Sequence, residues 1–208
     1  DKQSIARVQG NIGNIYYNLG DFKRAEEKFK LKLQMAKELG DKRAISISLG
    51  SLGNVYKQYG DYPSAEEAYS NAIEIAEEMG LKLYVADHSA NKARLMLLLG
   101  RHSEARALAE NAVRLAEELS RSDISLRSRI SIAVAEGSEN PRAAAKMLLD
   151  LLAAVGDNKE HAAEVHYEIY KLTGDNQHKE DAKALYNDLY ENTRNFLFKQ
   201  KLGDLEAH

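Results

Sequence analysis

Apolar side chains recur at matching places in two successive stretches of forty residues. Each large apolar residue of the first stretch has an apolar counterpart forty residues later, in the pairs Ile12 and Leu52, Tyr16 and Tyr56, Phe22 and Tyr62, and Phe29 and Tyr69. Ile12 and Tyr16 stand four residues apart, and Phe22 and Phe29 stand seven apart, so each of these pairs lies on one face of an α-helix. The pattern predicts two helices in every forty residues, and repetition of this length is typical of a helical solenoid.

Glycine marks where the predicted helices end. Residues 20, 40, 60, 80 and 100 are all glycine, and a glycine in the left-handed conformation is the commonest way to end an α-helix. Small residues also recur inside the helices, at Gly13 and Gly53 in the first helix of a repeat and at Ala25 and Ala65 in the second. They let two helices approach closely, while aromatic residues fill the space between layers.

The chain divides into five predicted repeats, which cover residues 6–45, 46–85, 86–123, 124–159 and 160–202. Positions are numbered so that the glycine ending the first helix of a repeat, Gly20 in the first one, is position 15. Pro63 and Pro141 both fall at position 18, where a proline can start the second helix because it has no amide hydrogen to leave unpaired. The last predicted helix spans about residues 178–202, and its mixed charges suit a polar C-terminal cap.

The repeat pattern weakens beyond residue 120. The large aromatic residues of position 24 are replaced by Ala109 and Met147 in the third and fourth repeats, and serine takes the place of the glycine stop at residue 120. Stability in a solenoid depends on the interfaces between neighbouring repeats. We therefore expect a weak interface near residues 120–140, where the array could flex.

These signatures resemble the tetratricopeptide repeat, in a forty-residue variant with lengthened helices. Residues 11–14 and 51–54, with the sequences Asn-Ile-Gly-Asn and Ser-Leu-Gly-Asn, are also similar to the repeats of LGN/Pins-type adaptors and of bacterial regulators. The resemblance covers about residues 4–120. It implies an all-α, right-handed superhelical α-solenoid of about five helical hairpins with a C-terminal capping helix. It also implies that the first helices line a concave groove, which in such adaptors binds an extended peptide.

The resemblance places positions 2, 5, 9, 12 and 13 of each first helix in the groove. Position 9 holds Asn14, Asn54 and Arg94 in the first three repeats, and we expect these residues to form a ladder. The other predicted binding residues, at positions 6, 12 and 13, are Asn11, Asn91, Tyr17, Asn18, Lys57 and Gln58. An asparagine amide can hold a peptide backbone because it both donates and accepts, and a guanidinium group suits a carboxylate. We expect the ligand to be an acidic or carboxylate-bearing peptide.

A structural role is the alternative for the same residues. An asparagine at position 9 can bond to a neighbouring helix and fix the angle at which helices stack, since most polar side chains near an interface serve structure. Arg94 can pair on the surface with Asp87 or Glu104. Tyr16 and Tyr56 are expected in the core.

Sequence patterns of catalysis and metal binding are missing, so we expect no enzymatic activity, no cofactor and no metal. His161 and His166 are five residues apart and face different sides of a helix, and the six histidines show no clustering with acidic residues. The net charge is −3, with lysines mixed among glutamates, which gives no argument for nucleic acid. No apolar run approaches the roughly 20 residues of a membrane span. We expect a cytoplasmic protein whose partner is a protein or peptide rather than nucleic acid or membrane.

A second hypothesis makes the chain one part of a larger signalling protein. The sequence begins at Asp1 without a methionine, so we expect an excised piece of a longer polypeptide. Such a piece would be the regulatory arm of a kinase, nucleotide cyclase or transcription regulator, because this repeat often accompanies these domains. Its groove would then bind its own chain or a twin subunit, which leaves a homo-oligomer open.

Overall fold

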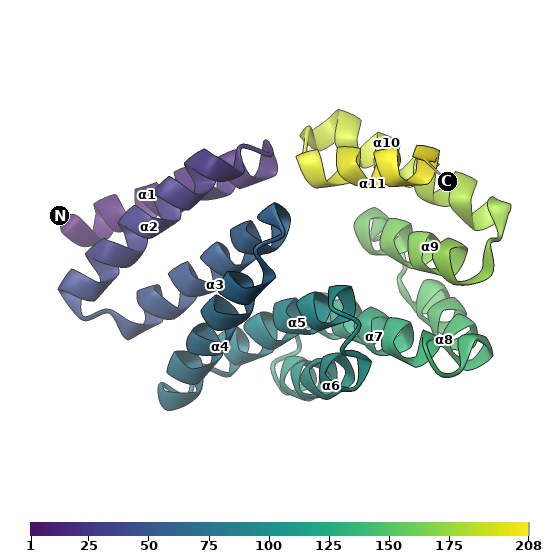
Figure 1. Cartoon of the computed structure of the whole chain (residues 1–208), viewed down its shortest axis with the longest axis horizontal. Coiled ribbons are helices and arrows are strands. Elements are labelled where there is room, and N and C mark those ends of the chain that lie inside the picture. The colour runs from purple at the N-terminus through teal and green to yellow at the C-terminus, as the bar shows by residue number, and fades with distance from the viewer. Residues whose placement is uncertain (208) are drawn as a thin grey trace.

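The computed structural model describes residues 1–207, which form helices and turns throughout. The helices are α1 (Lys2–Asn18), α2 (Phe22–Leu39), α3 (Lys42–Tyr59), α4 (Tyr62–Glu78), α5 (Lys82–Leu98), α6 (His102–Glu118), α7 (Ser122–Gly137), α8 (Pro141–Ala154), α9 (Lys159–Thr173), α10 (Asn176–Thr193) and α11 (Phe196–Ala207). Consecutive helices run back and forth in pairs, and the pairs follow one another along a curved array (Figure 1). Our division into five repeats, which remains a proposal, would place one pair in each from α1–α2 to α9–α10.

Aspartate and glycine form the ends of the early helices. The carboxylates of Asp21, Asp41 and Asp61 accept hydrogen bonds from backbone N–H groups three residues further on, at the starts of α2, α3 and α4. The predicted glycine stops all have positive φ, between 64° and 78°. Ser120 continues the twenty-residue spacing and adopts the same left-handed conformation, with φ 55°. The left-handed turns expected from the glycine spacing are confirmed.

Glycine inside a helix allows the two helices of a pair to pack closely. A Cβ atom on Gly13 would lie 2.6 Å from Cε1 of Phe29, and one on Gly53 would lie 2.7 Å from Cε1 of Tyr69. Both aromatic side chains are buried, Tyr69 completely. The glycine at position 8 therefore leaves the space that the aromatic residue at position 24 fills.

The C-terminal end differs from the prediction of one helix over about residues 178–202. Helix α10 ends at Thr193, because Arg194 adopts the left-handed conformation with φ 54°, and α11 follows as a separate helix. Asn195 caps this helix, since its Oδ1 accepts a hydrogen bond from the N–H of Leu197 (3.0 Å). The single long helix was wrong because the break falls on an arginine, a residue that favours helix and gives no sign of a left-handed turn.

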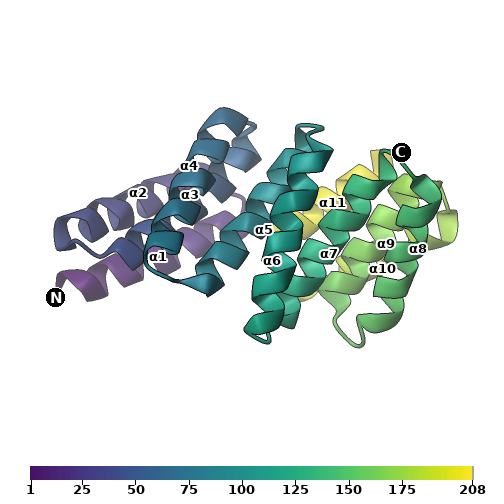
Figure 2. The same ribbon diagram turned by 90° about the horizontal axis from the view of Figure 1, so that it is seen from below.

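The array curves until its two ends meet. In Figure 1, α1 and α2 face α10 and α11 across the opening of the arc, and Figure 2 shows α11 behind α5–α7 in the view from below. The ring of Phe196 in α11 packs edge-on against Phe22 in α2, with centroids 5.6 Å apart. The all-α solenoid expected from the sequence is confirmed, and its own C-terminal helix closes it. None of the helices in residues 1–207 is long and apolar enough to cross a membrane.

Candidate functional site: a cationic cavity on the concave side

A polar cavity of about 290 Å³ lies on the concave side of the array. Its walls come from α1, α3, α5, α7 and α9 on one side and from α10 and α11 on the other. Six of the nine predicted binding residues line it, namely Tyr17, Asn54, Lys57, Gln58, Asn91 and Arg94. The repeat register thus brings most of the predicted residues to one place.

The three remaining predicted residues lie outside this cavity. Asn11 and Asn14 line a second cavity, of about 460 Å³, which α1, α2 and α3 enclose. Asn18 is exposed near the end of α1 and lines neither cavity. The ladder expected at position 9 is therefore divided, because Asn54 and Arg94 share a cavity from which Asn14 is absent.

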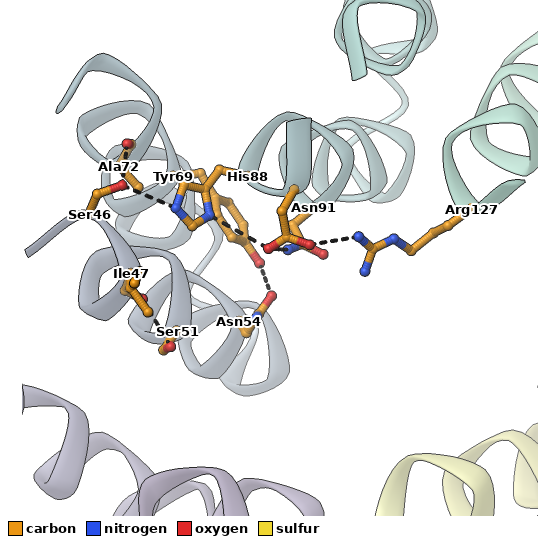
Figure 3. Close-up of polar contacts among 10 residues, drawn as sticks. Ser46, Ile47, Ser51, Asn54, Tyr69, Ala72, His88, Asn91 and Arg127 are labelled. Carbon is orange, nitrogen blue, oxygen red and sulfur yellow. Dashed lines mark hydrogen bonds and ion pairs between the residues drawn. The ribbon is translucent and has the colours of Figure 1, made fainter. Parts of the chain in front are cut away.

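Hydrogen bonds tie the asparagines of the central cavity to their own neighbours (Figure 3). The hydroxyl of Tyr69 in α4 donates to Oδ1 of Asn54 (2.6 Å), and Nδ2 of Asn91 donates to Oδ2 of Asp87 (3.4 Å). The carbonyl of Asn54 thus has the structural role that was the alternative, since it holds α4 against α3. Its amide nitrogen makes no hydrogen bond to the described residues, so this donor stays available to a ligand.

Arg94 pairs with an acid that the sequence did not suggest. Its Nη2 atom lies 2.5 Å from Oε1 of Glu164 on α9, which is 70 residues further along the chain. Of the two surface partners expected for Arg94, Asp87 pairs instead with Arg127 (2.7 Å), and Glu104 pairs with a neighbouring arginine. The expected surface pairing was wrong, because the curvature of the array brings α9 opposite α5.

Four charged residues of the cavity were missed from the sequence: Arg127 on α7, Glu160 and Glu164 on α9, and Lys201 on α11. When Gly174 is taken as position 15 of the fifth repeat, Glu164 falls at position 5, which is a groove position. The repeat register could therefore have identified Glu164 as a residue of the groove. Arg127 falls at position 4 of the fourth repeat, and Lys201 lies on the helix after the last pair. No groove position points to either of them.

The cavity holds more positive than negative side chains. Four cations line it, against two carboxylates, those of Glu160 and Glu164. Burial, and then repulsion from Arg94 and Arg127, lowers the pKa of Lys57 to about 7. A cation that is buried without a partner is destabilising, and an incoming anion would relieve that cost.

Two other cations of the cavity are incompletely paired. Burial lowers the pKa of Lys201, whose Nζ atom lies 3.7 Å from the ring centre of Tyr167 rather than against a carboxylate. The Nε atom of Arg127 is buried and has no hydrogen-bond partner in the described chain. Unpaired buried donors of this kind are uncommon in folded proteins. Together with Lys57, they mark the cavity as a site suited to an anion.

A cluster of histidine and acidic residues lies on the α9–α10 pair. His166 of α9 and His178 and Asp181 of α10 each offer one ligand atom, and these atoms all lie within 4.8 Å of one another. The expectation that no histidine clusters with acidic residues was therefore wrong. The partners come from two helices, and only the turn between α9 and α10 brings them together, so their spacing along the sequence matches no metal motif.

Stacked helix pairs around a concave side define an all-α solenoid of helical repeats. Residues 4–78 match the tetratricopeptide repeat family. Solved structures of tetratricopeptide repeats share the fold over almost the whole length. Residues 4–78 thus carry the sequence pattern of the tetratricopeptide repeat, and the chain as a whole has the fold of such repeat proteins.

Three solved structures show the extent of the likeness. The apo form of RapI superposes with a TM-score of 0.73 at 13% identity, over 100% of this chain and 65% of that one. A Podosopora anserina protein with nearly identical TPR-like repeats, described as a kinesin light chain, gives a TM-score of 0.67 at 17% identity, over 93% and 99%. YrrB, described as a TPR protein with an unusual peptide-binding site, superposes with a TM-score of 0.52 at 16% identity, over 91% of this chain and 87% of that one. No curated protein sequence matches the chain.

Proposed function

We propose that the concave cavity binds an acidic or carboxylate-bearing peptide segment of a partner protein. The observation that supports this is the convergence of four cationic side chains, from α3, α5, α7 and α11, on one cavity with only two carboxylates. Complementary charge of this kind raises the rate of association and selects the partner. The peptide-binding site named for YrrB agrees with a peptide as the ligand of this fold.

The ion pair between Arg94 and Glu164 marks where a carboxylate of the partner would bind. The two side chains meet at 2.5 Å and are both partly buried. A carboxylate of the partner could replace that of Glu164 because one charge-assisted hydrogen bond would exchange for another. Lys57 lies close enough to this pair for its pKa to respond to both members. The free amide of Asn54 could then hold the peptide backbone.

An extended peptide needs more room than the closed array offers. The cavity of about 290 Å³ lies just below the size of pockets that hold a small molecule, which are about 300–1,000 Å³. Leu197, Phe198 and Lys201 of α11 form part of its wall. Binding of a peptide therefore requires α11 to move away from α2, as a single helix at the end of an array can do more easily than an internal pair.

The position of α11 also favours a second candidate, in which the groove binds its own chain. In this case α11 is the resident occupant, and the chain acts as a regulatory arm of a larger signalling protein or of a twin subunit. A peptide of residues 194–207 should then bind to a chain truncated after Thr193. It should also be displaced from that chain by an acidic peptide.

Titration calorimetry with a defined pair of peptides tests the first proposal. The ligand is a short unstructured peptide of alternating Asp and Gly residues, and the control ligand has Asn in place of Asp. We expect only the acidic peptide to bind. Lys57→Met should weaken its affinity at least about tenfold, since one close charge contact is lost, while raising the stability of the free chain because a buried cation is removed.

The matched control is Lys82→Met, which removes an exposed ion pair with Glu118 (2.7 Å) and should leave the affinity unchanged. Opposite effects of Lys57→Met on stability and on affinity cannot result from unfolding. Equal binding of both peptides, or an unchanged affinity in Lys57→Met, would contradict the proposal.

A further inference from the structure

His166, His178 and Asp181 converge on one point between α9 and α10. The Nδ1 atoms of the two histidines lie 2.8 Å apart, and the Nδ1 atom of His166 lies 3.7 Å from Oδ2 of Asp181. The two imidazole rings are tilted by 43° with centroids 4.9 Å apart, so they meet at their nitrogen edges rather than stacking face to face. Three potential ligand atoms of different side chains therefore face one another.

These separations are close to those around a tetrahedral metal ion. Zinc binds histidine nitrogen at about 2.0–2.1 Å and carboxylate oxygen at about 2.0–2.2 Å, so two ligand atoms of a tetrahedral site lie about 3.3–3.5 Å apart. The observed distances of 2.8 Å and 3.7 Å fall on either side of this value. These two edges would have to change by about 0.7 Å or less, and the third, between His178 and Asp181, is at most 4.8 Å long, so rotation of the side chains could bring the three ligand atoms to this spacing.

A neighbouring side chain orients the carboxylate. Gln177 donates from Nε2 to Oδ1 of Asp181 (3.0 Å), which leaves Oδ2 as the oxygen that faces the histidines. Hydrogen bonds of this kind from a second layer of residues hold metal ligands in place and add to metal affinity. The site is open on one side, because the side chain of Asp181 is 40% exposed whereas that of His166 is 15% exposed.

We propose that His166, His178 and Asp181 bind a divalent transition-metal ion of the zinc class. Imidazole and carboxylate together suit Zn²⁺, and three protein ligands leave a fourth position for water or for a ligand from a partner. The ion would join the middle of α9 to the first turns of α10. It would thereby stiffen the helix pair that precedes α11. This site is separate from the concave cavity and does not depend on the peptide proposal.

The test uses the full chain without an affinity tag, stripped of metal with a chelator. Zn²⁺ is titrated by calorimetry, and Co²⁺ is followed by the visible absorption of a four-coordinate site. We expect one ion per chain and a rise in melting temperature with Zn²⁺. His178→Ala should weaken the Zn²⁺ affinity by more than about a hundredfold, and Gln177→Ala by about tenfold, the size of effect typical of a residue behind the ligands.

Two further variants keep the result interpretable. Asp181→Asn preserves the size of the side chain and an acceptor for Gln177, so a folded Asp181→Asn chain that no longer binds Zn²⁺ supports the site even if His178→Ala unfolds. His161→Ala, on the same helix as His166 but outside the cluster, should bind as the unaltered chain does. No saturable binding, binding unaffected by Asp181→Asn, or equal loss in His161→Ala would overturn the proposal and leave the two histidines as a hydrogen-bonded pair.

Discussion

An alanine at Gly20 should reveal whether α11 closes the array. Gly20 and Gly60 end equivalent helices with almost the same backbone, φ 78° and 77°. A Cβ atom at Gly60 would meet nothing within 4 Å, whereas one at Gly20 would lie 2.5 Å from Cγ of Phe196 on α11. The two substitutions therefore share one effect on the backbone and differ only in the contact with α11.

The expected magnitudes follow from these two contributions. A side chain in the left-handed conformation costs about 1–2 kcal/mol, and this alone should apply to Gly60→Ala. Overpacking against a neighbour adds typically about 1–3 kcal/mol, so Gly20→Ala should lower the free energy of unfolding by about 2–5 kcal/mol. If the clash at Gly20 is too severe, α11 can detach from the first helix pair instead. The additional destabilisation of Gly20→Ala is therefore limited to the free energy that α11 gains by docking, which comes from the burial of Phe196 and its edge-on contact with Phe22.

The assay is urea unfolding followed by far-ultraviolet circular dichroism, with both alanines made in the unaltered chain and in a Phe196→Ala background. Removal of the Phe196 ring should remove most of the difference between the two positions, because Cγ and Cδ2 of the ring are the nearest obstacles, at 2.5 Å and 2.7 Å, and only the Cβ atom at 3.0 Å would remain. Equal costs of Gly20→Ala and Gly60→Ala in the chain that retains Phe196 would refute the docking of α11 on the first helix pair.

Further predictions concern packing, charge and motion. Gly53→Ala should lower the free energy of unfolding by about 1–3 kcal/mol in urea melts despite the better helix propensity of alanine, because its Cβ would lie 2.7 Å from the buried ring of Tyr69. Since burial lowers the pKa of Lys57 to about 7 from an ordinary value near 10.5, the unfolded chain binds more protons between these values. Stability measured by urea unfolding should therefore rise with pH across this window because of Lys57, and Lys57→Met should remove that contribution. Hydrogen exchange should be faster in residues 120–140 than in residues 45–80 and should slow there when a peptide binds, and uniform protection would dismiss a flexible interface.

The large cavity beside α7 and α8 gives the last of these predictions a physical basis. It measures about 800 Å³, and its walls include Leu126 and Ile132 from α7 and Met147 and Leu151 from α8. Met147 stands where the first two repeats have the buried aromatic rings of position 24. A smaller side chain at that position leaves space between the helices and so weakens their packing.

The helices and their ends could be predicted from the sequence because their signals are local. A glycine that must be left-handed, an aspartate that caps the next helix and a glycine that faces an aromatic ring all act within one helix pair. The break at Arg194 was not predictable by the same means. The break lets α11 turn back and contact α2, which lies far away in the sequence and gives no local signal at residue 194.

The sequence could predict only the wall of the candidate site that the first helices of the repeats form, because the repeat register fixes which of their positions face the groove. Asn54, Lys57 and Arg94 share the cavity because each repeat places the same positions on the concave side. The opposite wall depends on total curvature, the sum of small rotations from one pair to the next, which no single repeat encodes. For this reason Lys201, and the pairing of Glu164 with Arg94, emerged only from the structure, although the register by itself puts Glu164 at a groove position.

The affinity of an Asp-containing peptide for a Glu164→Gln chain tests the central claim most directly. If Glu164 occupies the place of a partner's carboxylate beside Arg94, removal of its charge should raise the affinity for the alternating Asp and Gly peptide at least about tenfold, the lower end of coupling energies for close charge pairs. The peptide with Asn in place of Asp should gain nothing. An affinity for the acidic peptide that is unchanged or weaker in Glu164→Gln would contradict the account.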